Sequence, residues 1–381
     1  MAKPEIRLKG FKGEWENKLL GNLCSVNRGV RVTRKELNNQ GDYPVFQNTD
    51  YPMGFYNQYN VAGNNPFVII GGSAGLIGFS KKEFWAADDC VFFGDNAELD
   101  KAYLFNILLK HSSTIKKNVR GSSVPRLDRK VLVGLSISIP SIDEQQGIAD
   151  YFKSLDSMIQ GVTKEIASLK QMKQACLVSM FPQVGETKPR VRFKGFKGEW
   201  GKNKAGNLFM TFNERNRPDL PVLSANQDIR GMAPRTDTGY NISHNKANEV
   251  TYKVVKPGQY VIHLRSFQGG FAHSSVEGIT SPAYTVFGFK DAERHDDYFW
   301  KIIFMSKEFI KSLETITYGI RDGRSISFSE FAEMNFYFPS KEEQQQIASF
   351  FTSLDKQISL QEARLEKLKQ IKAACLDKMF V

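Results

Sequence analysis

The sequence predicts an α+β protein in which two β-rich globular domains are separated by two long antiparallel helices that form a coiled-coil spacer. Residues 140–181 return at 339–380 with a constant offset of 199 residues, and half of the 42 aligned positions are identical. A shorter segment, residues 6–23, returns at 191–208. Between these repeats, short apolar runs alternate with Gly-rich turns, which is typical of strands. An internal repeat of this extent predicts a pseudo-two-fold symmetric architecture.

Composition limits the class of protein. The chain has 381 residues, of which 41% are hydrophobic and 24% charged, so it is long enough for two or three globular domains. The formal net charge of +11 favours a polyanionic partner. None of the four cysteines forms a CxxC pair, no apolar run reaches the roughly 18 residues of a membrane span, and nothing resembles a signal peptide. We therefore expect a reducing, cytoplasmic location, no membrane contact and no bound metal.

The repeats divide the chain into four segments. The short repeat opens each half, and its residues Lys9–Trp15 match Lys194–Trp200 without a change. The first block, residues 24–139, and the second block, residues 209–338, do not align convincingly with each other. We predict a globular domain over 1–139, a helix over 140–181, a second domain over 182–338 and a second helix over 339–381.

Both blocks combine expected strands with one expected helix. In the first block, apolar runs predict strands at Phe67–Ile70 and Cys90–Phe93, with a Gly-rich turn between them. In the second block, the expected strands are Tyr252–Val255, Tyr260–Leu264 and Tyr284–Phe289. Each block then continues with a helix, a short basic loop and a last strand. The expected helices are Lys101–Lys117 and Asp296–Leu313, and the last strands are Leu135–Ile139 and Asn335–Phe338.

The long repeat predicts two long helices. Ser141 and Ser340 are candidate N-caps, and Glu144 and Glu343 follow three residues later, which is a capping-box signature. Apolar residues then recur three and four positions apart, so each helix has one apolar seam. The predicted packing residues are Leu155, Ile159, Val162, Ile166, Leu169, Met172, Leu354, Ile358, Leu365, Leu368 and Ile371. Cys176 and Cys375 share one slot of the repeat and are expected to pack in the core.

Connectivity predicts how the helices run. About ten residues join the end of the first helix to the second short repeat, so the second block is expected at the far end of that helix. The helices would then run antiparallel, with one block at each end. Two different domains held at a fixed spacing suit a bipartite target, and successive half-sites on B-DNA lie about 34–36 Å apart.

The chain resembles the specificity subunit of type I restriction–modification systems over its whole length. GEWENKLLGNL is similar to the opening of a target-recognition domain in that family, and PSxxEQQxIAxxF…SLD…LK, found at 140–170 and 339–369, is its helix motif. Residues 263–287 resemble the body of a recognition domain, and residues 71–93 do so more loosely.

The resemblance implies that each domain reads one half of an asymmetric split site in double-stranded DNA. It also implies that the helices dock two modification (adenine-N6 methyltransferase) subunits and that restriction/translocase subunits join outside them. S-adenosylmethionine, ATP and Mg would belong to those partner subunits, and this chain would have no catalysis and no cofactor of its own.

The residues agree with a non-catalytic chain. An adenine methyltransferase needs an Asn/Asp-Pro-Pro-aromatic motif and a Gly-rich cofactor loop. The nearest string, Asn64–Phe67, lacks the first proline and is better interpreted as the turn into a strand. There is no GxGxxG, Walker A or HExxH motif. Asp88 and Asp89 could form a carboxylate pair, but a solvated turn or an internal ion pair is the preferred interpretation.

Candidate DNA contacts are clusters of Arg, Lys, Asn, Gln, Ser and Tyr. Arg can bind phosphate or guanine O6 and N7, and Asn and Gln can pair with adenine. For any single residue an ordinary solvated or ion-paired side chain is the alternative. The first block offers Arg28, Arg31, Arg34, Lys35, Gln47, Asn48, Tyr51 and a closing loop with Arg120, Ser122, Ser123 and Arg126. The second offers Arg215, Arg217, Asn226, Gln227, Arg230, Arg235, Arg265, Gln268 and a closing loop with Arg321, Arg324 and Ser325.

Two other classes of function stay open at this point. One is a nuclease or methyltransferase fused to DNA-reading domains, against which the missing motifs argue. The other is a coiled-coil adaptor without nucleic acid. It would show no salt-dependent DNA binding, whereas a DNA reader loses affinity steeply as salt rises.

Overall fold

The computed structural model describes residues 3–38, 40–183, 185–226, 231–238, 246–263, 270–316 and 326–381. The chain forms two compact units. Unit 1 holds residues 1–165 and 361–381, and unit 2 holds residues 166–360. Each unit therefore combines one block with the beginning of one long helix and the end of the other.

Unit 1 is built around a four-stranded sheet with the strand order β2-β8-β5-β6, and all neighbouring strands are antiparallel. A second, three-stranded sheet has the order β4-β3-β7. The strands are β1 (Glu16–Leu19), β2 (Val26–Arg28), β3 (Tyr43–Phe46), β4 (Phe55–Tyr56), β5 (Asn65–Ile69), β6 (Ile77–Ser80), β7 (Trp85–Ala86), β8 (Cys90–Phe93) and β9 (Ser136–Ile139). The helices are α1 (Leu20–Leu23), α2 (Lys101–Lys110), α3 (Ser112–Lys117), α4 (Arg129–Val133) and the first part of α5 (Ile142–Ser179).

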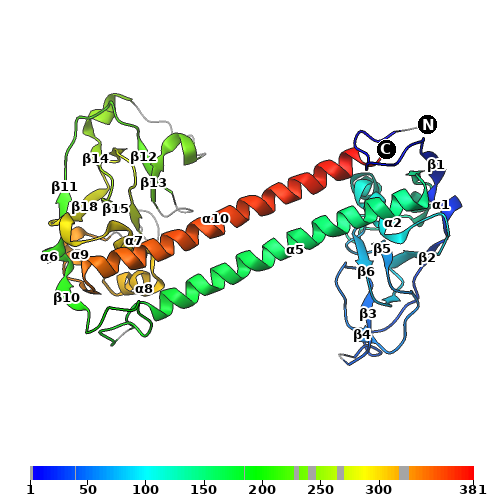
Figure 1. Cartoon of the computed structure of the whole chain (residues 1–381), viewed down its shortest axis with the longest axis horizontal. Coiled ribbons are helices and arrows are strands. Elements are labelled where there is room, and N and C mark those ends of the chain that lie inside the picture. The colour runs from blue at the N-terminus through cyan, green and yellow to red at the C-terminus, as the bar shows by residue number, and fades with distance from the viewer. Residues whose placement is uncertain are drawn as a thin grey trace. The chain divides into compact units, whose positions relative to one another are not determined.

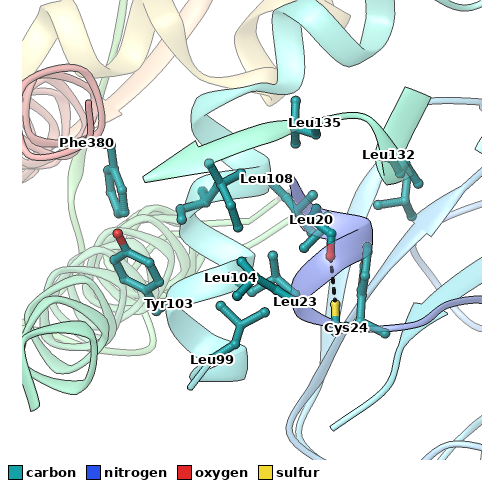
Figure 2. Packing of buried hydrophobic residues seen from close by; sticks show 14 of the residues in the cluster. Leu20, Leu23, Cys24, Leu99, Tyr103, Leu104, Leu108, Leu132, Leu135 and Phe380 are labelled. Atoms are coloured by element: carbon teal, nitrogen blue, oxygen red, sulfur yellow. Dashed lines mark hydrogen bonds between the residues drawn. The ribbon is translucent and has the colours of Figure 1, made fainter. Parts of the chain in front are cut away.

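The core of unit 1 lies between the four-stranded sheet and α2. On another side of α2, Leu20 and Leu23 of α1 face Leu104, and each of these leucines is at most 4% exposed (Figure 2). Burial on this scale stabilises by about 2 kcal/mol per leucine relative to exposure. Phe380, next to the end of the chain, stands beside Tyr103 with 5.5 Å between ring centroids. Cys375 in the last turn of α10, with Met379 and Phe380 after it, thus belongs to the core of unit 1. Figure 1 shows the red end of α10 beside the elements of this unit.

Unit 2 has a larger, six-stranded sheet with the order β11-β18-β15-β16-β13-β12. Its strands are β10 (Gly201–Lys204), β11 (Phe209–Phe212), β12 (Leu223–Asn226), β13 (Gly231–Pro234), β14 (Lys253–Val255), β15 (Tyr260–Ile262), β16 (Phe271–His273), β17 (Gly278–Thr280), β18 (Thr285–Phe289) and β19 (Asn335–Phe338). Its helices are α6 (Ala205–Leu208), α7 (Asp297–Met305), α8 (Lys307–Ile316), α9 (Phe328–Ala332) and the first part of α10 (Lys341–Lys378), with short 3-10 turns η1 (Arg235–Thr238), η2 (Lys246–Thr251) and η3 (Ala292–Arg294). The core is mainly aromatic, with Phe209 in contact with Trp300, Phe304 and Phe331.

The repeated segments form the same frame in each unit, whereas the blocks differ. In unit 1, β1 pairs antiparallel with β9, and in unit 2 β10 pairs antiparallel with β19. Trp15 and Trp200 are buried at 1% and 3% exposed. The central sheets have four and six strands, so the two blocks are different structures on one frame. The predicted α+β fold class is confirmed.

The capping signature of the long helices has a different role from the one predicted. The Glu144 N–H donates to Ser141 Oγ at 3.4 Å, but both Glu144 carboxylate oxygens accept hydrogen bonds from Arg7, at 2.7 Å each. Arg192 and Glu343 repeat this pair at 2.6 Å. The Glu144 carboxylate binds Arg7 rather than the backbone N–H of the N-cap residue, because the planar guanidinium, with five N–H donors, is a stronger bidentate partner.

The glutamine that follows each of these glutamates joins the long helix to its block. Gln145 Oε1 accepts the N–H of Asp100, and Gln145 Nε2 donates to the carbonyl oxygens of Glu98 and Pro140. Likewise, Gln344 Oε1 accepts the N–H of Asp296, and Gln344 Nε2 donates to the carbonyl oxygen of Pro339. Asp100 and Asp296 cap α2 and α7 with their side chains. The first two residues of the EQQ string are therefore structural, because the glutamate binds an arginine of the short repeat and the glutamine that follows holds the start of the block's main helix.

The helix pair is antiparallel within each unit. In unit 1, Tyr151 Oη lies 3.4 Å from Cys375 Sγ, Lys372 pairs with Asp156, and Gln361 donates to Glu165, so α10 residue numbers fall as α5 numbers rise. In unit 2, Lys173 pairs with Asp355. Lys173 and Lys372 occupy one slot of the repeat, and so do Asp156 and Asp355. Each ion pair is therefore the symmetry counterpart of the other.

Most predicted packing residues lie in the helix seam. Leu155, Val162, Ile166, Leu354 and Ile358 are buried, and the list of half-buried members is Ile159, Leu169, Leu365 and Leu368. Met172 and Ile371, which share one repeat slot, are exceptions at 44% and 37% exposed. The reason is register: buried positions alternate by four and three residues, as in a heptad, and this spacing places Lys173 and Lys372 in the seam. Cys375 packs in the unit 1 core and Cys176 against that of unit 2, as predicted.

Two helices expected to be continuous are interrupted. The segment 101–117 forms α2 and α3 with His111 between them, and 296–313 forms α7 and α8 with Ser306 between them. Ser306 has an extended backbone, and its Oγ accepts the N–H of Phe309 at 3.1 Å. A serine side chain in this position caps the start of a new helix, which is why α7 ends and α8 begins there. Asn64 has a φ of 55°, in keeping with its interpretation as a turn before β5.

Candidate nucleic-acid interface

One edge of the four-stranded sheet of unit 1 gathers several predicted DNA contacts. The end of β2, the end of β5 and the start of β8 meet at this edge, because Arg28 pairs with Val91 and Ile69 pairs with Cys90. The topology therefore brings Arg28, the Gly-rich turn after β5 and Asp88–Asp89 together. Gly71 lies so close to Asp89 that a Cβ there would be 2.4 Å from the carboxylate carbon.

The closing loop is joined to the same edge. Arg120 and Arg126 exchange two backbone hydrogen bonds of 2.9 and 2.8 Å, which close a small hairpin. Gly121 in this hairpin has a φ of 94°, a conformation that favours glycine. Gly72 N–H donates to Pro125 O at 3.1 Å, and Leu127 N–H donates to Ile70 O at 2.9 Å. Ser122 and Ser123 lie exposed at the tip.

Asp89 lies between two arginines. Its Oδ1 is 3.2 Å from Arg126 Nη1 and 3.9 Å from Arg28 Nη2. Arg28 Nε also donates to the carbonyl oxygen of Asp88. The internal ion pair preferred from the sequence is thus present at Asp89. Both guanidiniums remain more than half exposed, at 52% and 60%.

Gln47 and Asn48 connect this edge to an open pocket. Gln47 Nε2 donates to Asp88 Oδ1 at 3.3 Å, and Asn48 O accepts the N–H of Ser73 at 3.1 Å. A pocket of about 590 Å³ is lined by Arg31, Val32, Thr33, Arg34, Leu37, Gln47, Asn48, Met53 and Gly54. A neighbouring pocket of about 390 Å³ shares Arg28 and Arg126 with the ion pair, and its lining adds Ile70, Leu127, Asp128 and Arg129. Lys35 and Tyr51 are exposed.

The structure therefore brings most first-block candidates to one surface. Arg120 lies on the same hairpin, but its guanidinium donates to Lys117 O and Val119 O. Those bonds cap the end of α3, which favours a structural role for this residue. Arg129 lines the smaller pocket and was missed from the sequence. Its position directly after the basic closing loop is the sequence signal that could have identified it.

In the second block, the described candidates do not form one comparable cluster. Arg217 forms a bidentate pair with Asp219, at 2.9 and 2.8 Å, and this pair lowers the pKa of Asp219. Arg215 donates to Asn213, and Arg235 donates to Ser224 Oγ beside Asn226 on β12. The remaining candidates lie outside the described residues: Gln227, Arg230, Arg265, Gln268, Arg321, Arg324 and Ser325.

The comparison with known families decides the identity of the chain. A family model described as the type I restriction modification DNA specificity domain matches residues 12–171 and 198–370. The chain belongs to this family. It is the DNA specificity subunit of a type I restriction–modification system, a non-catalytic component, as the sequence resemblance implied.

Relatives and solved structures agree with this assignment. The specificity subunit is 23% identical to the type I restriction enzyme MjaVIII specificity subunit of Methanocaldococcus jannaschii, over 94% of this chain and 90% of that one. It is 29% identical to a putative type I specificity subunit of Mycoplasma pneumoniae, over 41% of this chain, and this match spans only 44% of that relative's length. Its fold is similar to that of a crystal structure of a type I restriction–modification S subunit from M. genitalium, with a TM-score of 0.68, 16% identity and 100% and 99% of the two chains covered.

Within the part of the specificity subunit that the structure describes, no group of three or more His, Cys, Asp and Glu residues is arranged to hold a metal ion. No helix of the described residues is long and apolar enough to cross a membrane.

Proposed function

We propose that the specificity subunit reads a bipartite, asymmetric site in double-stranded DNA, with the first block recognising one half and the second block the other. Residues 1–139 and 182–338 would be the two target-recognition domains, and 140–181 and 339–381 the spacer helices that set the distance between half-sites. The protein would act in the cytoplasm, where chromosomal and incoming DNA are present.

The observation that carries this proposal is the surface of unit 1 around Arg28, Gln47, Asn48 and Arg126. These side chains combine forked cationic donors with an amide pair beside open pockets. Guanine offers O6 and N7 acceptors in the major groove, and adenine offers an acceptor and a donor side by side. Such residues can therefore read base edges, while exposed lysines such as Lys35 contact phosphate and position the protein.

A second part of the proposal concerns partner subunits. Several exposed residues are identical in the two repeats, although half of the long repeat has diverged. Examples are Lys9 and Lys194, Lys12 and Lys197, Gln146 and Gln345, Lys170 and Lys369, and Gln171 and Gln370. Burial in the core does not explain their identity. A partner that binds the frame twice does, and we propose two adenine-N6 methyltransferase subunits in this role.

Chemistry would then belong to those partners. The methyltransferase subunits would bind S-adenosylmethionine, flip the target adenine and transfer the methyl group. Restriction/translocase subunits with ATP and Mg would join outside them. The specificity subunit would contribute recognition, spacing and docking.

The test is co-expression with the methyltransferase subunit from the same operon, followed by mapping of N6-methyladenine across the host genome. We expect one split motif, of which a single half changes when residues 24–139 are exchanged for those of another specificity subunit. A stable assembly without a methylated motif would contradict the claim that the two blocks specify sequence. Failure to assemble at all would favour a coiled-coil adaptor instead.

A further inference from the structure

Asp89 is a carboxylate placed at the centre of a cationic surface. Its side chain is 19% exposed, directly before β8, and both arginine contacts are made by Oδ1. In the part of the chain that the structure describes, Oδ2 accepts no hydrogen bond. Gly71 packs against the carboxylate and leaves no room for a side chain. One oxygen of Asp89 is thus engaged by arginines, and the other accepts no hydrogen bond from the described residues, on a side chain that remains partly exposed.

A carboxylate in this position disfavours a phosphate contact. A phosphate beside Asp89 would meet a like charge, and Asp89 neutralises part of the charge of the two guanidiniums that would attract it. The edge of a base is neutral and carries both acceptors and donors, so it fits a mixed Arg–Asp surface better than the DNA backbone does. By the same reasoning, an exposed lysine such as Lys35 suits a phosphate contact, whereas the surface around Asp89 suits a base contact.

The donors that remain define which base fits. Among the described residues, Arg126 donates from its side chain only through Nη1, to Asp89. The Nε–Nη2 side of its guanidinium is therefore available as a fork. Arg28 is held more firmly, because its Nε donates to Asp88 O. A forked guanidinium matches guanine O6 and N7, and a carboxylate oxygen matches the N4 amino group of cytosine.

We propose that Asp89 is a positioning and specificity-determining residue through which the first block reads one G·C base pair. Asp89 holds Arg126 so that its fork faces guanine O6 and N7, and Asp89 Oδ2 accepts from cytosine N4 of the same pair. This inference rests on the proposed function, because it names the base pair that the unit 1 surface recognises.

The experiment compares methylation motifs of four variants, each co-expressed with the methyltransferase subunit. Asp89→Asn and Arg126→Ala are the test variants, Asp89→Glu is the conservative variant, and Asp95→Asn is the matched control. Asp95 lies in the same block and pairs with Lys101 at 3.4 Å, but its side chain is 93% exposed, and it follows β8 whereas Asp89 precedes that strand. Thermal unfolding of each variant reports whether it is folded.

We expect the wild-type half-site read by residues 24–139 to contain a G·C pair whose discrimination falls about tenfold or more in Asp89→Asn and Arg126→Ala. The other positions of the motif should stay unchanged. Asp89→Glu should keep a preference for the same pair, and Asp95→Asn should retain the wild-type motif.

Two results would overturn the inference while leaving the proposed function intact. One is a half-site without a G·C pair. The other is a folded Asp89→Asn variant whose motif is unchanged or weakened equally at every position, which would mean that Asp89 only stabilises the loop. A wild-type protein that directs no motif at all would instead refute the proposed function, and the inference with it.

Discussion

The Arg7–Glu144 and Arg192–Glu343 pairs show what single residues of the repeat contribute. Glu144 and Glu343 have side chains only 2% and 1% exposed, so their charge must be met inside the protein. The two arginines come from the short repeat and the two glutamates from the long one. Each pair therefore joins the short repeat at the start of one half of the chain to the start of the long helix in that half, across more than a hundred residues of sequence.

Removing one partner should be costly. Arg7→Ala leaves the buried Glu144 carboxylate without its bidentate partner, and we expect the free energy of unfolding to fall by about 2–4 kcal/mol, which urea denaturation would measure. Arg190→Ala is the control, because Arg190 is 63% exposed in its pair with Glu186, and a solvent-screened ion pair contributes much less than a buried one. Equal losses for the two variants would contradict the structural role of Arg7.

His295 predicts a dependence of stability on pH. Burial lowers its pKa below the ordinary 6.5, Nδ1 has no hydrogen-bond partner among the described residues, and the ring stacks on Phe289 at 4.8 Å. Because the folded state binds the proton less well than the unfolded state, the contribution of His295 is fully present above pH 6.5 and is lost as the pH falls below it. Urea denaturation between pH 7.5 and 5 should show a decline that is smaller in His295→Phe. An identical pH dependence in that variant would rule out His295 as a source.

At the scale of elements, the helix pair is governed by heptad register rather than by apolar character alone. Met172 is apolar but exposed, whereas Lys173 takes the seam position and pairs with Asp355. Likewise, Ile371 is exposed, whereas Lys372 takes the seam position and pairs with Asp156. Two lysines in equivalent seam positions, each with an aspartate on the other helix, pin the alignment of the helices within each unit.

This register makes a direct mutational prediction. Leu155→Ala removes a side chain that is 4% exposed in the unit 1 core, and we expect a loss of about 2–4 kcal/mol in the free energy of unfolding. Met172→Ala, on the outer face of the same helix, should change it by less than about 1 kcal/mol. Chemical denaturation of the two variants distinguishes them, and a larger loss in Met172→Ala would place the seam elsewhere.

At the scale of the whole molecule, the excess of 11 positive charges predicts how the protein meets DNA. Each phosphate contact releases counterions, so affinity falls steeply as salt rises. With six or more such contacts, we expect a loss on the order of 10³-fold between 50 and 200 mM salt for the assembled complex, measured by fluorescence anisotropy.

Two substitutions separate phosphate contacts from base contacts in the same assay. Lys35→Ala should weaken binding to all sequences and lower the salt slope by about 1, whereas Arg126→Ala should relax specificity with the slope nearly unchanged. Affinity that does not respond to salt would contradict DNA recognition by this chain and support the adaptor alternative.

The sequence predicted the frame more accurately than the blocks, for reasons visible in particular residues. The repeat predicted α5 and α10 within three residues at each end, because a long amphipathic helix is specified by local periodicity. The breaks at His111 and Ser306 escaped prediction, since apolar spacing continues through both. Among the candidate contacts, nothing in the spacing of Arg28, Asp89 and Arg126 shows that they meet, because 98 residues separate the first from the last.

The sequence by itself determined the duplicated plan, the two long helices, the α+β class and the family, because these follow from local pattern and from identity between the two copies. Only the tertiary structure decided that Glu144 binds Arg7 instead of capping its own helix, that Lys173 rather than Met172 enters the seam, and that Asp89 lies between two arginines. Each of these depends on which distant segments a sheet edge or a helix end brings within hydrogen-bond distance. The pairing of strands and helices sets that geometry, and spacing along the chain does not encode it.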